Sequence, residues 1–290
     1  MRLSVLVAIF LIALIGQLPA GAAKSPPAAI LLAAGDIADC SWDGAQLTAG
    51  LIESRPGTVA AIGDTAYPTG SASDYANCYQ PTWGRFKSRT RPALGNHEYL
   101  TAGAGAYFAY FGRKAAPPGG YYSYRLGSWH IVVINSNCDQ IGGCGPGSKQ
   151  LRWLRADLAN HPARCTLAYW HHPRFSSGPH GSNEVMQPVW AALVKAGADV
   201  VLSGHDHLYQ RFAPLDASGR IDPAGGIREF VVGTGGGSLY PAVRPIAASR
   251  KIIEHWGILR LKLGSNRYYW RFLSTNPTGR VLDSGSGACH

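Results

Sequence analysis

The chain has 290 residues, and 27 Lys and Arg against 17 Asp and Glu give it a formal charge of +10. Only 15% of the residues are charged whereas 46% are hydrophobic, which excludes an intrinsically disordered chain. The 36 glycines and 19 prolines indicate many turns, and no internal repeat predicts a solenoid or a propeller. The composition therefore favours a basic, loop-rich globular protein.

The first predicted element is a leader peptide. Arg2 precedes an apolar run over residues 3–15, and small residues follow as far as Ala22 and Ala23. This pattern is typical of a secretory signal cleaved after one of these two alanines. The run is short for a membrane span, and no later segment is apolar enough to be one. We therefore expect residues 1–23 to be removed and the protein, without a membrane span, to be secreted or periplasmic.

Apolar runs that end in polar sequence predict buried strands along the rest of the chain. The runs cover residues 28–34, 58–62, 91–94, 166–170 and 198–203. Helix-like stretches alternate with them over residues 44–54, 151–159 and 184–196. After about residue 210 strand patterns dominate, over residues 228–232, 256–263 and 267–273. The sequence thus predicts one α/β domain over residues 24–290, with a β-rich C-terminal third.

The six cysteines predict disulfide bonds, because an exported chain folds in an oxidising compartment. Cys138 and Cys144 flank a short, Gly-rich loop that can close locally. Cys40 and Cys78 lie in loops after two strand-like runs, which leaves the cysteines at positions 165 and 289. Many other pairings are possible for six cysteines, so the connectivity stays open.

Oxygen and imidazole donors follow the predicted strands. They are Asp36, Asp64, Asn96, His171, His205 and His207. In open α/β folds, ligands bind in loops beyond the carboxyl ends of strands, and this mixed donor set suits Zn, Fe or Mn better than Ca. A single Gly-Asp pair is more often a simple turn, but several such signatures in order indicate a metal site.

The order of these motifs resembles that of the calcineurin-like metallophosphoesterases. The matching segments are Gly35-Asp36, Gly63-Asp64, Gly95-Asn96-His97-Glu98, His171 and Gly204-His205-Asp206-His207. The segment from Gly63 to Tyr67 and the absence of a histidine at position 38 make the chain most similar to the purple acid phosphatase branch. The resemblance implies a four-layer α/β/β/α sandwich, in which helices flank two mixed β-sheets. It also implies a secreted, acid phosphatase-like enzyme that hydrolyses phosphate monoesters with a hydroxide bridging two metal ions.

The resemblance also implies a ligand set with Asp64 as the bridge between two ions. The first ion would be held by Asp36, Asp64, Tyr67 and His207, and the second by Asp64, Asn96, His171 and His205. A phenol ionises readily only on a strong Lewis acid, so Tyr67 indicates Fe(III) at the first site, with Zn, Fe or Mn at the second. The alternative is a Tyr67 that packs beneath the loop.

Two histidines are candidates for proton transfer to the leaving group. His97 is similar to the family histidine that contacts substrate and acts as general acid. His180, nine residues after His171, is the second candidate, although an exposed loop histidine without a role is equally compatible. Glu98 either orients His97 or caps a turn.

Several alternatives stay open at this point. A phosphodiesterase or nucleotide hydrolase would use the same metal ligands, and a non-catalytic exported protein could bind metal or phosphate with them. The expected partner is a small-molecule phosphate ester. We expect no specific nucleic-acid binding, because the basic residues are scattered without a run. The Gly-rich segment at residues 233–237 predicts a tight turn, since no P-loop lysine follows it.

Overall fold

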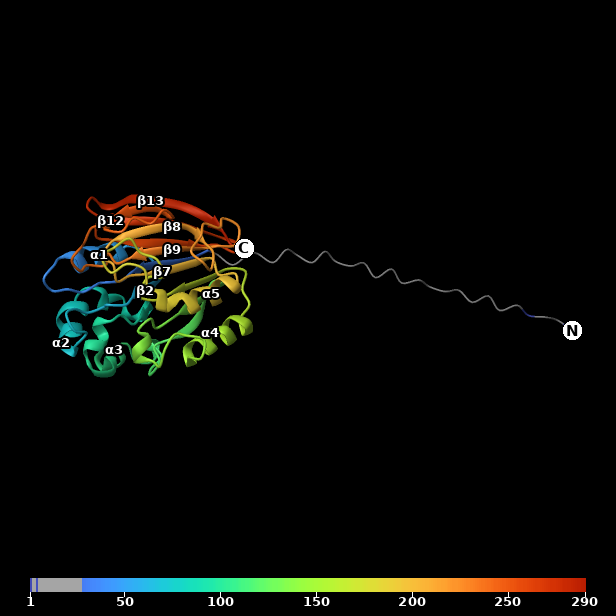
Figure 1. The fold of residues 1–290 in the computed structure, drawn as a ribbon, viewed down its shortest axis with the longest axis horizontal. Helices are drawn as coiled ribbons and strands as arrows, with labels where there is room; N and C mark the ends of the chain where they lie inside the picture. Colours follow the sequence, from blue (N-terminus) through green and yellow to red (C-terminus); the bar gives the residue numbers. More distant parts are fainter. Residues whose placement is uncertain (2–3, 5–27) are drawn as a thin grey trace.

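Two β-sheets lie face to face at the centre of the computed structural model, which describes residues 1, 4 and 28–290 (Figure 1). The predicted leader peptide therefore lies outside the described residues, apart from two isolated positions. Within the described part of the chain, no helix has the length and apolar character needed to cross a membrane.

The first sheet has six strands in the order β13-β12-β11-β1-β2-β3. Their bounds are β1 Ala29–Ala34, β2 Thr58–Ile62, β3 Thr90–Ala93, β11 Gly257–Leu263, β12 Arg267–Thr275 and β13 Thr278–Ala288. Strands β1, β2 and β3 run parallel, whereas β11, β12 and β13 join them by antiparallel pairing. The sheet is therefore mixed, and its three parallel strands end at one edge.

The second sheet has seven strands in the order β10-β8-β9-β7-β6-β5-β4. Their bounds are β4 Tyr122–Leu126, β5 Trp129–Val133, β6 Thr166–Tyr169, β7 Val200–Ser203, β8 Tyr209–Leu215, β9 Ile227–Val232 and β10 Ser249–Ile253. Strands β5, β6, β7 and β9 are parallel, and β4, β8 and β10 are antiparallel to their neighbours. This sheet is also mixed.

Helices cover the outer faces of both sheets. Helix α1 (Gly44–Glu53) packs on the first sheet, while α4 (Lys149–Asn160) and α5 (Gln187–Lys195) pack on the second. The shorter α2 (Ala72–Asp74) and α3 (Gly105–Phe111) lie in the connections around β3. Ser148 caps α4 by accepting the N–H of Leu151 at 3.1 Å, so the helix begins where the sequence supplies a capping oxygen. The predicted four-layer α/β/β/α sandwich is confirmed.

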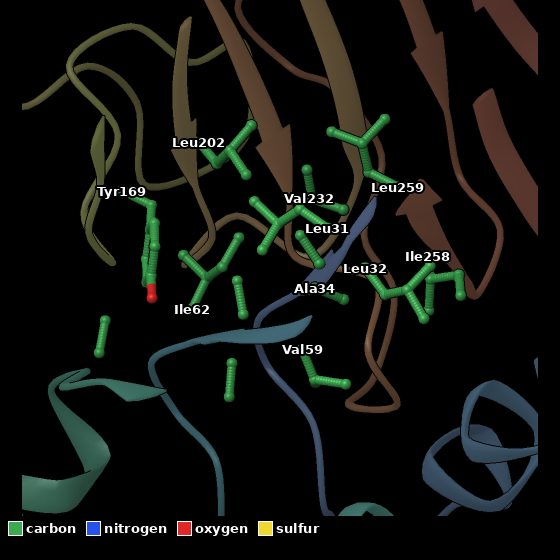
Figure 2. Packing of buried hydrophobic residues seen from close by; sticks show 14 of the residues in the cluster. Leu31, Leu32, Ala34, Val59, Ile62, Tyr169, Leu202, Val232, Ile258 and Leu259 are labelled. Atoms are coloured by element: carbon green, nitrogen blue, oxygen red, sulfur yellow. The ribbon is translucent and has the colours of Figure 1, made fainter. Parts of the chain in front are cut away.

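Apolar side chains from the two sheets interlock between them. Figure 2 shows Leu31 and Ile62 of the first sheet in one cluster with Leu202 and Val232 of the second. All four side chains are fully buried. Burial of such side chains stabilises the sandwich by roughly 1.5–3 kcal/mol each relative to exposure, so this layer fixes how the two sheets face each other.

Each strand and helix predicted from the sequence is present, with ends shifted by a few residues. The predicted strand at 198–203 begins at Val200, and the predicted helix at 184–196 becomes a 3₁₀ turn followed by α5. The sequence prediction missed five strands, namely β4, β5, β8, β10 and β13. The disulfides are Cys40–Cys78, Cys138–Cys144 and Cys165–Cys289, the arrangement considered from the sequence.

Candidate metal centre

The carboxyl ends of parallel strands from both sheets meet at one site. Asp36, Asp64 and Asn96 follow β1, β2 and β3 of the first sheet. His171 follows β6 of the second sheet, and the two histidines at 205 and 207 follow β7. The fold thus brings together side chains that are up to 171 residues apart in the chain, as expected for a site at the ends of strands.

The hydroxyl of Tyr67 lies at the centre of one half of the site. It is 3.1 Å from Asp36 Oδ1, 3.2 Å from Asp64 Oδ2 and 3.0 Å from His207 Nε2. His207 Nε2 is itself 3.2 Å from Asp36 Oδ1. These four side chains, which the family resemblance assigns to a first ion, therefore converge on one point.

The carboxylate of Asp64 also belongs to the other half of the site. His171 Nε2 lies 3.1 Å from Asp64 Oδ2 and 3.1 Å from Asn96 Oδ1. His205 completes this group, because its ligand atom lies within 4.8 Å of those of Asp64 and His171. The carboxylate of Asp64 thus lies between the two groups of donors and contacts both.

Backbone carbonyls orient two of the imidazoles. His171 Nδ1 lies 3.0 Å from the carbonyl oxygen of Ile62, and His207 Nδ1 contacts the carbonyl oxygen of Ser238. A carbonyl oxygen only accepts, so Nδ1 carries the proton in both rings. Nε2 of each ring then faces the carboxylates, and it is the nitrogen that a cation would bind in exchange for its proton, an arrangement typical of metal-binding histidines.

Three of the converging residues have strained backbone. Asp36, Asp64 and His205 have φ angles of 59°, 45° and 69°. A residue other than glycine rarely adopts this left-handed region, and such strain gathers at functional sites. Asp36 and His205 support each other, since Asp36 Oδ2 accepts the N–H of His205 at 2.9 Å.

Glu98 is fully buried beneath the loops and binds their backbone. Its carboxylate accepts the N–H groups of Asp64 at 3.0 Å, Thr65 at 2.7 Å and Gly95 at 2.7 Å. Gly95 is required there, because a Cβ at this position would lie 2.1 Å from Asp64 Oδ1. From the sequence, we expect Glu98 either to orient His97 or to cap a turn. These contacts with backbone N–H groups match the capping role.

The buried charges shift one another's pKa values. Burial by itself would lower the pKa of His171, but Asp64 and Asp36 raise it to about 10. Burial would raise the pKa of Asp64, but His171 and His97 hold it well below its usual range. Burial, together with Asp36 and Asp64, raises the pKa of the Tyr67 phenol well above 10. Tyr67 is therefore protonated here unless a strong cation replaces its proton.

His97 and His180, the two predicted proton donors, lie at the rim of the site. The ring of His97 lies 4.5 Å from that of Tyr67, and its Nε2 lies 3.9 Å from Asp64 Oδ2. The ring of His180 lies 4.2 Å from that of His205, and its side chain is exposed. Both histidines are thus next to converging donors and open to solvent.

Sequence reasoning missed two residues that shape this rim. Asp206 is buried, and its carboxylate accepts the N–H of His180 at 3.0 Å and the hydroxyl of Ser176. Its place between two histidines in the motif was an available signal. The ring of Tyr240 stacks on that of His207 at 4.3 Å, and no local sequence signal marks it.

The Gly-rich segment forms the predicted turn beside the site. The N–H of Gly235 donates to the carbonyl of Gly35 at 2.9 Å, and that of Gly237 donates to the carbonyl of Asp36 at 2.8 Å. The segment therefore binds the backbone of the β1 loop and fixes the position of the first ligand.

The chain is similar in sequence to a known family of proteins. Residues 10–209 match the family model described as calcineurin-like phosphoesterase. The chain is 30% identical over 224 residues to purple acid phosphatase 15 of Arabidopsis thaliana, which covers 64% of this chain and 41% of that protein. It is 27% identical over 303 residues to purple acid phosphatase 22 of the same plant, which covers 92% of this chain and 66% of that protein. The chain thus spans only part of the length of these relatives.

Solved structures with a similar fold include two that cover most of this chain. The purple acid phosphatase PPD1 from yellow lupin seeds has a TM-score of 0.68 at 19% identity and covers 90% of this chain and 54% of its own. GAP50, described as the anchor in the inner membrane complex of Plasmodium, has a TM-score of 0.73 at 16% identity and covers 91% of this chain and 90% of its own. At these identities the likeness concerns the fold. The family model, which spans more than half of the chain, and the plant relatives show that the chain belongs to the calcineurin-like phosphoesterase family, with purple acid phosphatases among its relatives.

Proposed function

We propose that this chain is a secreted dinuclear-metal phosphatase that hydrolyses phosphate monoesters. The observation that carries the proposal is the position of Asp64, whose Oδ2 lies 3.2 Å from the hydroxyl of Tyr67 and 3.1 Å from His171 Nε2. One carboxylate is thus shared by two groups of donors, as a bridge between two ions requires.

The charges of the site support two bound cations. The carboxylates of Asp36 and Asp64 are buried, and among residues 28–290 their ion-pair partners are histidines and never Lys or Arg. Two buried carboxylates that are compensated only by imidazoles, which can exchange a proton for a metal ion, form a donor set that metal ions fit. The residues that would hold the ions are Asp36, Asp64, Tyr67 and His207 for the first, and Asp64, Asn96, His171 and His205 for the second.

The first site favours Fe(III) because of Tyr67. Its phenol has a pKa raised well above 10 by burial and the two carboxylates, so only a strongly acidic ion would displace the proton. The second group has two imidazoles, one amide oxygen and one carboxylate, which suits Zn, Fe or Mn.

The protein's own residues would divide the remaining work between them. When bound, the two ions supply a water of lowered pKa and positive charge against the phosphate oxygens. Asp64 holds the two groups of donors at a fixed separation, and its Oδ1 accepts the N–H of His97 at 2.9 Å. His97 is thereby anchored beside the site by its backbone while its ring is partly exposed to an incoming ester.

His97 and His180 are the proposed proton donors to the leaving alkoxide. The Nδ1 of His97 contacts the carbonyl of Pro68 at 2.6 Å, so Nδ1 carries a proton and Nε2 is free to hold or release one on the substrate side. His180 Nε2 lies 3.4 Å from the hydroxyl of Tyr240. Proton transfer by such groups contributes roughly 10²–10⁴-fold to rate in general.

Export after cleavage near Ala22 or Ala23 belongs to the same proposal, with residues 24–290 as the mature catalytic domain. Three disulfides join all six cysteines, which supports an oxidising compartment. A formal charge of +10 favours anionic substrates such as small phosphate esters.

The test is a panel of esters offered to purified protein reconstituted with iron and zinc. We expect hydrolysis of p-nitrophenyl phosphate and alkyl monoesters, with little turnover of bis-p-nitrophenyl phosphate. A preference for the diester or for nucleotides would assign the same site to a diesterase or nucleotide hydrolase. A protein loaded with two ions but inactive on every ester would instead be a non-catalytic metal- or phosphate-binding protein.

A further inference from the structure

A second cluster of metal-ligating side chains lies on the second sheet, away from the candidate metal centre. It consists of His130 in β5, Asp157 in the last turn of α4, and His161, which follows that helix. In the sheet, His130 pairs with Thr166 at the start of β6, whereas His171 follows the end of β6. His171 lies five residues after Thr166, which corresponds to about 16 Å along an extended chain. The two clusters are therefore at opposite ends of the parallel strands, the second cluster at the amino ends and the candidate metal centre at the carboxyl ends.

The three side chains meet around the carboxylate of Asp157. His130 Nε2 lies 2.9 Å from Asp157 Oδ2. His161 Nδ1 lies 2.9 Å from Asp157 Oδ1 and 3.0 Å from the backbone carbonyl oxygen of Asp157, a contact that an ion bound at Nδ1 would replace. The ligand atoms of all three residues lie within 4.8 Å of one another. This spacing allows one ion to contact all three.

Two of these atoms lack a hydrogen-bond partner. His130 Nε2 and Asp157 Oδ2 are both buried, with side chains 3% and 5% exposed. They lie at hydrogen-bond distance from each other, yet neither makes a hydrogen bond of acceptable geometry within the described residues. The other carboxylate oxygen is satisfied, because it accepts the hydroxyl of Ser123 at 2.7 Å. Buried polar atoms normally have a hydrogen-bond partner. A carboxylate oxygen and an imidazole nitrogen that are buried without one could both be satisfied by a metal ion bound between them.

We propose that His130, Asp157 and His161 bind one zinc ion, or a similar divalent first-row cation, separate from the two ions of the candidate metal centre. Two imidazoles and one carboxylate are ordinary zinc ligands. The half-exposed side chain of His161, 52% accessible, leaves a route for the ion and a place for a water ligand. The site also lies at the C-terminal end of α4, where the helix dipole favours a cation.

Arg125 is a cationic side chain next to the cluster, but its hydrogen bonds within the described residues are with backbone and not with the three ligand side chains. Arg125 donates instead to the carbonyl oxygens of His161 at 3.3 Å and Pro162 at 3.0 Å. It thereby fixes the backbone on which His161 is carried. The bound ion would connect β5 to the end of α4, so its expected effect is on the stability of the fold and not on catalysis.

The experiment measures zinc content after incubation with ZnCl₂ and gel filtration, together with the zinc dependence of Tm. We expect His161→Ala and Asp157→Asn to hold one zinc ion fewer per chain than the wild type. Zinc should raise the Tm of both proteins, and the increase should be a few degrees larger for the wild type than for His161→Ala. The matched control is His255→Ala, an exposed histidine outside both clusters, which should bind as the wild type does.

An Asp64→Asn background separates this proposal from the catalytic one. The Asp64→Asn protein should retain a single zinc ion, and adding His161→Ala should remove it. Because His161 is half exposed, its substitution should leave the fold and the hydrolysis of esters unchanged, which circular dichroism and activity verify. Equal zinc content and equal zinc-dependent Tm in the wild type and His161→Ala would overturn the proposal, whether or not the enzyme is active.

Discussion

Glu98 Oε2 accepts the backbone N–H of Asp64 at 3.0 Å, and so holds a residue whose φ of 45° lies in the left-handed region. Asp64 is the proposed bridge between two ions, so the carboxylate below it secures the most demanding position in the site. The buried carboxylate of Glu98 thus compensates the backbone strain at Asp64. Its hydrogen bonds within the described residues go to the loop backbone and to Thr65, and not to the side chains of the proposed ligands.

Removing this acceptor should destabilise the protein. Glu98→Ala would leave the N–H groups of Gly95, Asp64 and Thr65 without their partner, and we expect the free energy of unfolding to fall by about 2–4 kcal/mol. Urea unfolding of metal-free protein measures this. Glu98→Gln keeps one carbonyl oxygen as an acceptor, so its free energy of unfolding should fall clearly less. The control Glu254→Ala, on the surface, should change the free energy of unfolding by less than about 0.5 kcal/mol. Equal stability of Glu98→Ala and wild type would refute the proposal that Glu98 stabilises the backbone of these loops.

Tyr67 should give the iron-loaded protein its colour. A phenolate bound to Fe(III) absorbs visible light by charge transfer, so the wild type should be coloured and Tyr67→Phe colourless. Visible spectra of both proteins, with iron measured in the same samples, test this. Tyr240→Phe is the matched control, because that phenol stacks on His207 yet is not a proposed ligand. A band that survives in Tyr67→Phe would remove the ferric assignment.

His97 should contribute more than His180 to the hydrolysis of esters with poor leaving groups. An alkyl phosphate needs a proton on its leaving oxygen, whereas p-nitrophenolate leaves without one. We expect His97→Ala to lower kcat on an alkyl phosphate by about 10²-fold or more and on p-nitrophenyl phosphate by much less, with a smaller effect for His180→Ala. His255→Ala serves as control. Equal losses on both esters would mean that His97 binds phosphate and does not deliver the proton.

Stability should depend on pH through Glu229. Burial raises its pKa from the usual 4.5 to about 8, although the N–H groups of Phe175 and Arg174 oppose the shift. The folded state thus prefers the protonated acid, and this contribution to stability is complete below about pH 4.5 and falls as pH rises toward 8. The stability difference between wild type and Glu229→Gln should therefore drop by about 3–5 kcal/mol over this range. Urea unfolding at several pH values measures it, and a constant difference would contradict the shift.

The sequence predicts the site better than it predicts the edges of the sheets. β1 and β2 were predicted because each apolar run stops at a Gly-Asp pair, so strand end and ligand share one local signal. Strand β13 carries no such signal, since it is polar and Gly-rich. Packing explains two of its glycines. A Cβ at Gly285 would lie 2.3 Å from the ring of Trp270, and a Cβ at Gly287 would lie 2.4 Å from the ring of Tyr268.

Of the other features that the sequence prediction missed, one has a local signal and the rest depend on contacts between distant segments. The hairpin of β4 and β5 does have a local signal, a Gly-Ser pair at residues 127–128 between two strand-like runs. Tyr240, by contrast, reaches His207 through contacts between distant segments, since its backbone N–H donates to the carbonyl of His207 at 3.3 Å and its ring stacks on the imidazole. The cluster of His130, Asp157 and His161 likewise exists only because α4 packs on the second sheet.

The most direct test of the dinuclear centre compares metal content and aryl phosphate hydrolysis in the wild type and Asp64→Asn. Asp64 is the one side chain shared by both groups of donors, so its substitution should remove two ions together and lower kcat/KM by at least about 10³-fold. Asp139→Asn, a substitution of an exposed aspartate, should keep both properties. An Asp64→Asn protein that keeps its ions and hydrolyses p-nitrophenyl phosphate at the wild-type rate would contradict the shared-carboxylate centre.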